Sequence, residues 1–360
     1  MHRSRYRWAA AVGTLTLLIG LAACGSDDAP PTSSSTTVSA TTTSSTTKTT
    51  TKSVEPTTTS TPPPAPPAPP PVNALTGKEF SANLVVAAKI DNTFPGQQWG
   101  VGSADVVVVE MVEGQLSRLI AIFHTDIPAE VGPVRSVRTT DPDLLVAYGT
   151  PALMFSGGAG GPMDNFAASG LVNASPDAIG SAYWHSSAAS APYNLHGNVA
   201  TVVTSLGGIS APSNPGFTFN DNDPLVAASR GATTITATFA NPISFSYNGD
   251  GTYSYIRRGS TQTDGASGAP FQISNVLVQH TSAAPDGTVD SAGSPSYKSY
   301  TTGGGSFTLY RDGKAMEGTW SRPDTNSPTT YTTGVGTPAP FKTGRTWIVL
   351  APEQIPTGDS

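Results

Sequence analysis

A long tract that is poor in large apolar residues limits where this chain can fold. Residues 26–73 are dominated by threonine, serine, proline and alanine, with few charged side chains. A segment of this composition cannot bury enough apolar surface to offset the entropy lost on ordering. Its proline-rich end, 62–71, predicts stiff polyproline II structure. We therefore expect residues 24–73 to form a disordered linker and the folded body to begin at Ala74.

The residues before this linker have the pattern of a signal peptide. Three arginines lie within the first seven residues, and the apolar run that follows, 9–21, is too short to anchor stably across a bilayer. The run ends in Leu21-Ala22-Ala23-Cys24-Gly25, which resembles the bacterial lipobox, where cleavage before the cysteine follows diacylglyceryl transfer to its thiol. We expect residues 1–23 to be a lipoprotein signal peptide. The alternative is an ordinary signal peptide in which Cys24 is incidental.

Lipidation of Cys24 would place the protein on the outer face of the bacterial cytoplasmic membrane, attached through its lipid alone. Cys24 is the single cysteine of the chain, so it has no partner for a disulfide. We expect no cofactor other than the covalent diacylglyceryl group.

The folded body is mildly acidic, which restricts its partners. Five basic and three acidic residues precede Ala74, so the formal charge of −6 for the chain becomes −8 for the body. Binding to nucleic acid or to an anionic lipid surface depends on a basic surface. We therefore expect no nucleic-acid partner, and any anion site must be local.

The first half of the body, 74–225, mixes strand and helix patterns. Nearly continuous apolar runs at 84–90, 106–112 and 119–124 are typical of strands covered on both faces, and the last two are spaced as a hairpin. Asp141 is expected to be the N-cap of a helix that has Pro142 at its first position. Gly149 is expected to end this helix. Further short helices are expected near 163–169 and 199–206. These patterns predict a mixed α/β domain with a covered sheet.

The second half, 231–353, has strand patterns alone. Alternating aromatic residues at 243–247 and 252–257 flank a turn that is rich in glycine and asparagine, and further strands are expected at 271–280, 306–310, 316–320 and 346–350. Residues 207–224, rich in glycine, proline and asparagine, are the expected boundary. The fold class is therefore α+β, with a mostly β second domain.

Several short motifs, each weak alone, form a specific set between residues 75 and 352. They are Ala88-Lys89-Ile90-Asp91-Asn92, residues 104–110, Val112-Glu113-Gly114 with Arg118, residues 132–138, Ala191-Pro192-Tyr193-Asn194-Leu195, Asn275-Val276, residues 310–314 with Thr319-Trp320, and residues 344–348. Together they resemble the YerB-like bacterial lipoproteins, a family of unknown function with an N-terminal and a C-terminal part. The family pattern has histidine where Tyr193 stands and arginine near His185. Asn92, His185 and Asn194 are further candidate pocket residues.

Arg118, Arg135 and Arg138 are the sharpest candidates for a binding site. If the segment with Arg135 and Arg138 is turned or helical, the two side chains face the same way. Clustered guanidinium groups beside a helix N-terminus suit an anion. Alternatively, Glu113, Asp141 and Asp143 neutralise the arginines in a structural network, the more usual fate of buried arginines.

Two classes of function remain open. In the first, the protein is a tethered, non-catalytic module that binds a cell-wall glycopolymer or an envelope protein. In the second, it is an envelope enzyme whose arginines hold the phosphate or pyrophosphate of a lipid-linked glycopolymer, with Asp91 or Asp141 as a metal ligand. The acidic residues follow no known metal-binding loop, and the histidines have no ligand spacing. We therefore expect no metal site and favour binding.

Overall fold

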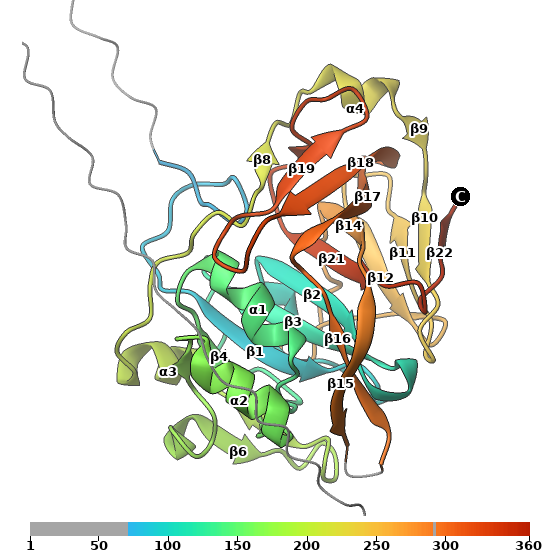
Figure 1. Ribbon diagram of the computed structural model, residues 1–360. Coiled ribbons are helices and arrows are strands. Elements are labelled where there is room, and N and C mark those ends of the chain that lie inside the picture. The colour runs from blue at the N-terminus through green and yellow to red at the C-terminus, as the bar shows by residue number, and fades with distance from the viewer. Residues whose placement is uncertain (1–70, 291–292) are drawn as a thin grey trace, which may run out of the picture. The chain divides into compact units, whose positions relative to one another are not determined.

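The structure, a computed structural model, describes residues 71–290 and 293–360 (Figure 1). The expected signal peptide, Cys24 and nearly all of the expected linker lie outside these residues. Within the described part of the chain, no helix is both long and apolar enough to cross a membrane.

The apolar runs of the first half form three neighbouring strands of a large sheet. These are β1 (Val86–Asp91), β2 (Val106–Met111) and β3 (Ser117–Phe123), and every residue in them is buried. Strands β2 and β3 form the expected antiparallel hairpin, and β3 also pairs antiparallel with β1. β3 is therefore the middle strand of the three.

The large sheet runs in the order β19-β18-β17-β14-β21-β2-β3-β1-β4-β5, with β9 paired to β18. The further strands of this sheet are β4 (Ala152–Met154), β5 (Val172–Asn173), β9 (Arg230–Gly231), β14 (Asn275–His280), β17 (Gly303–Arg311), β18 (Lys314–Arg322), β19 (Thr330–Thr333) and β21 (Thr346–Ala351). Strand β21 lies between β2 and β14 and is parallel to both. The two halves of the body therefore share one continuous sheet, visible in Figure 1 where β21 lies beside β2.

The second half also forms a smaller sheet, in the order β13-β12-β11-β10-β22. Its strands are β10 (Thr234–Ala237), β11 (Ile243–Tyr247), β12 (Tyr253–Arg257), β13 (Ser260–Thr261) and β22 (Thr357–Asp359). Strands β11 and β12 are the expected aromatic hairpin. Three two-stranded pairs complete the β structure: β15 (Ala283–Val289) with β16 (Pro295–Ser299), β8 (Thr218–Phe219) with β20 (Pro340–Phe341), and β6 (Tyr183–His185) with β7 (Leu195–Gly197).

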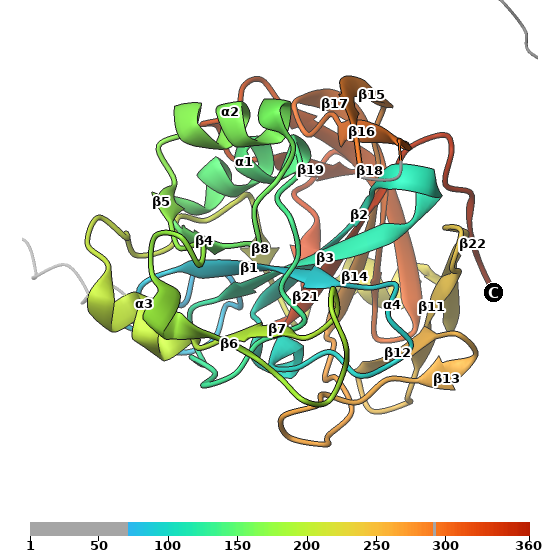
Figure 2. The same cartoon turned by 90° about the horizontal axis from the view of Figure 1, so that it is seen from below.

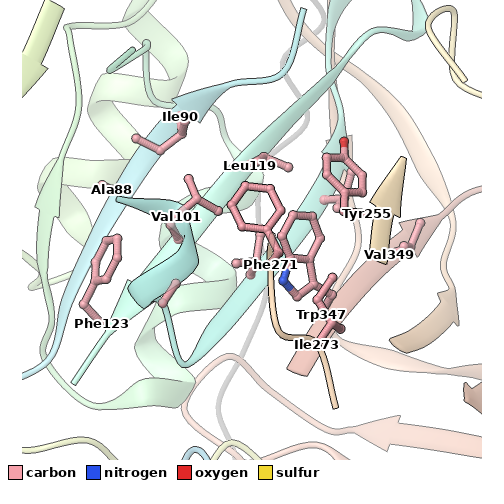
Figure 3. Packing of buried hydrophobic residues seen from close by; sticks show 14 of the residues in the cluster. Ala88, Ile90, Val101, Leu119, Phe123, Tyr255, Phe271, Ile273, Trp347 and Val349 are labelled. Atoms are coloured by element: carbon pink, nitrogen blue, oxygen red, sulfur yellow. The ribbon is translucent and has the colours of Figure 1, made fainter. Parts of the chain in front are cut away.

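Two apolar cores cover the two faces of the large sheet. On one face, Trp347 of β21 packs against Tyr255 and Phe245 of the smaller sheet, with ring centroids 4.6 and 5.7 Å away (Figure 3). The opposite face is covered by α1 (Thr140–Leu145) and α2 (Gly160–Ala168), which contribute Leu145 and Phe166 to the second core. Figure 2 shows these helices on one side of β1 and the β6–β7 pair on the other. The α+β architecture follows from this layering.

The helix expected to have Asp141 as its N-cap begins two residues earlier than predicted. Thr139 is the N-cap of α1, and Asp141 lies inside the first turn rather than at the cap. The Asp141 carboxylate still accepts a hydrogen bond from the amide of Arg138, at 2.8 Å, but its other oxygen is bound by buried Lys89. A 3-10 turn, Val146–Tyr148, continues α1 as far as Gly149, whose φ of 104° ends it as expected. The remaining helices are α3 (Val199–Ser205) and α4 (Pro224–Ala228).

Candidate anion-binding pocket

Ionisable side chains on three adjacent strands form a row across the large sheet. The neighbouring positions on the same face of these strands carry apolar side chains. Arg118 of β3 lies opposite Asp91 of β1 on one side and opposite Glu110 of β2 on the other. Alternation along the strands places these residues on the face covered by α1 and α2, in line with the apolar residues Ile120 and Val108. The sheet therefore holds three ionisable side chains side by side at the end of its central strands.

Glu110 of this row also belongs to a buried cluster with Lys89 and Asp141, and none of the three side chains is exposed. The Lys89 ammonium donates to the Glu110 carboxyl and, at 2.6 Å, to Asp141 Oδ1. Burial and the nearby charge of Asp141 raise the pKa of Glu110 to about 8, although Lys89 opposes that shift. Because Glu110 keeps its proton at neutral pH, one ammonium is balanced by one carboxylate. Lys89 and Glu110 were not singled out as site residues in the sequence, where both are part of strand runs.

Asp91 holds two of the three candidate arginines. Its Oδ2 lies 3.6 Å from Arg118 Nε and 3.4 Å from Arg135 Nε. Its Oδ1 accepts hydrogen bonds from the amides of Thr93 and Phe94, both at 2.6 Å. Burial lowers the pKa of Arg118, and the Asp91 charge counteracts this shift. Two guanidinium groups share one carboxylate here, so a positive charge remains at this end of the sheet.

Arg138 forms an ion pair with Glu113, in which two guanidinium nitrogens approach the two carboxylate oxygens. Arg138 Nε is 2.6 Å from Glu113 Oε1, and its Nη2 donates to Oε2 at 2.8 Å. Burial alone would raise the pKa of Glu113, but hydrogen bonds from Arg138 and Ser296 lower it. The Ser296 hydroxyl belongs to β16 and donates at 2.5 Å. This pair is therefore fixed from both halves of the chain.

The arginines do not make the side-chain pairs with Asp141 and Asp143 that the structural-network alternative expected. Asp141 binds Lys89, and Asp143 pairs with Lys298 of β16 at 2.5 Å. Of the acids in that alternative, Glu113 alone forms an ion pair with a candidate arginine among the described residues, because Asp91 supplies the other carboxylate.

All three arginines open onto one cavity of about 500 Å³, which we call the arginine pocket. Its other walls are Glu113, Gly114, Leu116 and Ser136 from the first half, Gly158, Ala159 and Pro162 at the start of α2, and Val289, Asp290, Ser294 and Ser296 of the β15–β16 hairpin. The side chains of Arg118, Arg135 and Arg138 are 7, 19 and 12% exposed. The guanidinium groups thus lie in one hollow, partly shielded from bulk water.

Two groups of wall residues were not expected from the sequence. The glycine-rich segment 156–161 lacks the spacing of a phosphate-binding motif, yet Gly158 and Ala159 line the pocket. The β15–β16 hairpin comes from the second half and is held in place by Ser296, which donates to Glu113, and by Asp286, which accepts from Thr139 at 2.6 Å. Neither placement has a local sequence signal, because both depend on how distant segments pack.

The remaining candidates lie away from this pocket. Asn92 is buried and donates to Ser117 Oγ at 2.7 Å, while its Oδ1 accepts from Gln98 and Tyr255. His185 is exposed on β6, and its Nδ1 lies 3.4 Å from Asn194 Oδ1. No group of three or more histidine, cysteine, aspartate or glutamate residues in the described part of the chain is placed to hold a metal ion.

Comparisons with known proteins identify the family. Residues 74–209 match the family described as "Protein of unknown function (DUF3048) N-terminal domain", and residues 234–348 match its C-terminal domain. The chain is 24% identical over 271 residues to "Putative lipoprotein YerB" of Bacillus subtilis (strain 168), covering 71% of this chain and 77% of that protein. The crystal structure of YerB from Bacillus subtilis matches with a TM-score of 0.66 and 22% identity, over 80% of this chain and 99% of that chain, and so shares its fold. This chain therefore belongs to the YerB-like family that the sequence motifs indicated.

Proposed function

We propose that this protein is a lipid-anchored, extracytoplasmic binding module that holds an anionic group of a cell-envelope component in the arginine pocket. The lipobox-like sequence at Cys24 and the lipoprotein name of the Bacillus subtilis relative support the anchor. A long linker between the anchor and the body would let the pocket reach its ligand away from the bilayer.

The observation that carries this proposal is the convergence of Arg118, Arg135 and Arg138 on one cavity. Guanidinium groups present forked donors that match phosphate and carboxylate oxygens, and partial burial strengthens such contacts. Asp91 and Glu113 orient the three groups while leaving the shared charge of Arg118 and Arg135 incompletely balanced.

The enzymatic alternative has weaker support from these contacts. It needs Asp91 or Asp141 as a metal ligand. Asp91 is already bound to two arginines and two amides, and Asp141 to Lys89 and the Arg138 amide. Recruiting either carboxylate to a metal would require breaking these buried contacts, which is costly.

Thermal unfolding in the presence of anions tests the proposal. Phosphate, pyrophosphate and an isolated phosphate-bearing envelope glycopolymer are added to the wild-type body, residues 71–360. A ligand at about 100 times its Kd stabilises the native state by about 2.7 kcal/mol, so the unfolding midpoint should rise with ligand concentration.

The Arg135→Gln variant separates binding from stability. Asp91 keeps Arg118 as its partner in this variant, so stability should change little while the response to anions is lost. Arg345→Gln is the matched control, since Arg345 pairs with Asp126 outside the pocket and its loss should leave anion binding intact. A wild-type unfolding midpoint that does not rise with any of these anions at millimolar concentration would contradict the proposal.

A further inference from the structure

A second cavity, of about 280 Å³, has walls of a different chemistry. It is lined by Phe94, Gly96, Gln97, Trp99, Pro133, Ala188, Ala189, Tyr193 and His196, and we call it the aromatic pocket. Four of these residues carry aromatic rings, and Gln97 is exposed at its edge. Cavities with mainly apolar walls and a few polar groups are typical small-ligand sites.

Arg135 joins the aromatic pocket to the arginine pocket. Its Cζ lies 5.2 Å from the centroid of the Tyr193 ring, and its Nη1 donates to the carbonyl of Pro192 at 3.0 Å. The same guanidinium lines the arginine pocket and contacts Asp91. The two cavities therefore lie on either side of the Arg135–Tyr193 contact, and one ligand with an anionic part and an uncharged part could occupy both.

The aromatic rings of this pocket form two contacting pairs, one stacked and one edge-on. Tyr193 stacks on Phe94 with centroids 5.1 Å apart and planes at 21°. Trp99 meets His196 edge-on, at 5.6 Å and 61°. His196 is itself fixed by Glu130, whose Oε1 is 2.7 Å from Nδ1. Phe94 and Tyr193 occupy each other's faces, so this pair offers no open slot for a flat base.

The second half of the chain holds the loop that carries Phe94. The buried Arg257 guanidinium donates to the carbonyls of Asn92, Phe94 and Gly96, the last at 2.6 Å. Arg258 adds a hydrogen bond to the carbonyl of Thr93, at 2.7 Å. A loop fixed in this way loses little conformational entropy on binding, which favours affinity.

We propose that the aromatic pocket is a saccharide subsite, so that the protein binds a glycan whose sugar ring lies against the aromatic walls and whose phosphate lies in the arginine pocket. This inference rests on the proposed anion-binding function. A sugar ring has an apolar C–H surface that packs on aromatic rings, whose faces are electron-rich, and a rim of hydroxyl groups that an amide such as Gln97 can bind. The adjoining arginines select an anionic glycan over a neutral one.

Calorimetry with a graded set of probes tests the saccharide subsite on the body, residues 71–360. The probes are inorganic phosphate, hexose oligosaccharide 1-phosphates of increasing length, neutral oligosaccharides of the same lengths, and adenosine monophosphate. The tightest saccharide phosphate should bind about tenfold more tightly than inorganic phosphate, because one aromatic contact surface contributes on the order of a tenfold gain. Neutral oligosaccharides should bind most weakly.

Variants in the aromatic pocket test whether the added affinity for the saccharide phosphate arises there. Trp99→Ala and Gln97→Ala should each reduce the advantage of the saccharide phosphate over phosphate, while phosphate itself binds as in the wild type. Gln97 is exposed, so its variant tests the subsite even if Trp99→Ala folds poorly. Phe80→Ala is the control, because Phe80 is a 59% exposed aromatic residue that lines neither pocket.

The outcomes separate this inference from the proposed function. Phosphate binding with no added affinity for any saccharide phosphate would overturn the saccharide subsite alone. Adenosine monophosphate binding more tightly than every saccharide phosphate would also overturn it, in favour of a nucleotide. Failure of phosphate and all phosphorylated probes to bind would instead refute the anion-binding function.

Discussion

Glu110 is fully buried between Lys89 and Asp141, and its environment couples protonation to folding. Its pKa is raised to about 8 from an ordinary value of 4.5. Between these values the folded protein keeps a proton that the unfolded chain releases, so stability from this group is present below the unfolded pKa. It is lost as the pH rises from the unfolded pKa to the folded pKa, by up to about 1.4 kcal/mol per pH unit.

We predict that Glu110→Gln removes this pH dependence. Glutamine resembles the protonated acid in shape, so the variant should differ from the wild type by no more than about 1 kcal/mol near pH 5. As the pH rises from 5 to about 8, the wild type should lose stability relative to the variant, and above pH 8 the difference should level off. Denaturant unfolding of both proteins at pH 5, 6, 7, 8 and 9 measures the difference, and parallel curves at all pH values would argue against a protonated Glu110.

Lys89 should be far more sensitive to substitution than an exposed lysine. Lys89→Met removes the ammonium and leaves the Asp141 carboxylate buried beside an apolar side chain, which should cost about 3–5 kcal/mol of unfolding free energy. Adding Asp141→Asn should recover part of this loss. Lys78→Met, at an exposed position, is the control and should change stability by no more than about 0.5 kcal/mol. Equal effects of Lys89→Met and Lys78→Met would show that Lys89 is not buried as described.

At the scale of elements, the most constrained connection is the loop 92–98 that leaves β1. It curls around the Arg257 side chain, which is 1% exposed and projects from β12 of the smaller sheet. The loop begins at Asn92, whose side chain also receives the Tyr255 hydroxyl of the same strand. Both contacts tie a first-half loop to second-half strands.

We predict that Arg257→Lys loosens this loop. Lysine keeps the charge but lacks the planar fork that reaches several carbonyls, so the variant should lose about 2 kcal/mol of stability and residues 92–97 should exchange amide hydrogens faster. Arg258→Lys is the neighbouring control, since Arg258 is exposed and makes a single side-chain hydrogen bond to this loop. If the two variants exchange at the same rate through 92–97, the loop is held by something other than the Arg257 fork.

At the scale of the whole molecule, the shared sheet makes the two halves interdependent. Thr346 to Val349 of β21 pair with Val106 to Val109 of β2. The same strand carries Trp347, on which the aromatic rings of the smaller sheet pack. Removing the second half would expose β2 as an apolar edge strand and one apolar face of the sheet, which favours aggregation.

We predict that residues 71–233 alone do not form a stable fold. The fragment should be insoluble or lack cooperative thermal unfolding, whereas co-expression with residues 234–360 should restore a soluble complex. The intact 71–360 body serves as the reference. Cooperative unfolding of the first fragment by itself would show that its sheet is stable without β21.

The proposed membrane anchor gives a separate prediction for the full chain. Cys24→Ser should move the protein from the membrane fraction to the soluble fraction, because no thiol remains to accept the diacylglyceryl group. Ser33→Ala, in the same linker, should leave it membrane-bound. The check is fractionation together with mass spectrometry, and a Cys24→Ser protein that stays in the membrane without lipid would point to another attachment.

Local signals in the sequence were enough to predict the three buried strands of the first half. The runs at 84–90, 106–112 and 119–124 became β1, β2 and β3 because nearly every residue in them is apolar, which suits a strand covered on both faces. Gly149 ended its helix as expected because its φ of 104° is unfavourable for other residues. The arginines 118, 135 and 138 were also identified from their clustering.

The partners of those arginines were decided by tertiary structure. Asp141 and Asp143 are close to Arg138 in sequence, yet their carboxylates bind Lys89 and Lys298, while Arg138 binds Glu113 and Arg135 contacts Asp91. Strand register and the packing of α1 on the sheet set these distances, and neither is encoded in local spacing. The β15–β16 hairpin likewise reaches the pocket from a segment more than a hundred residues away. Short-range patterns determine which residues form strands, whereas long-range packing determines which charges meet.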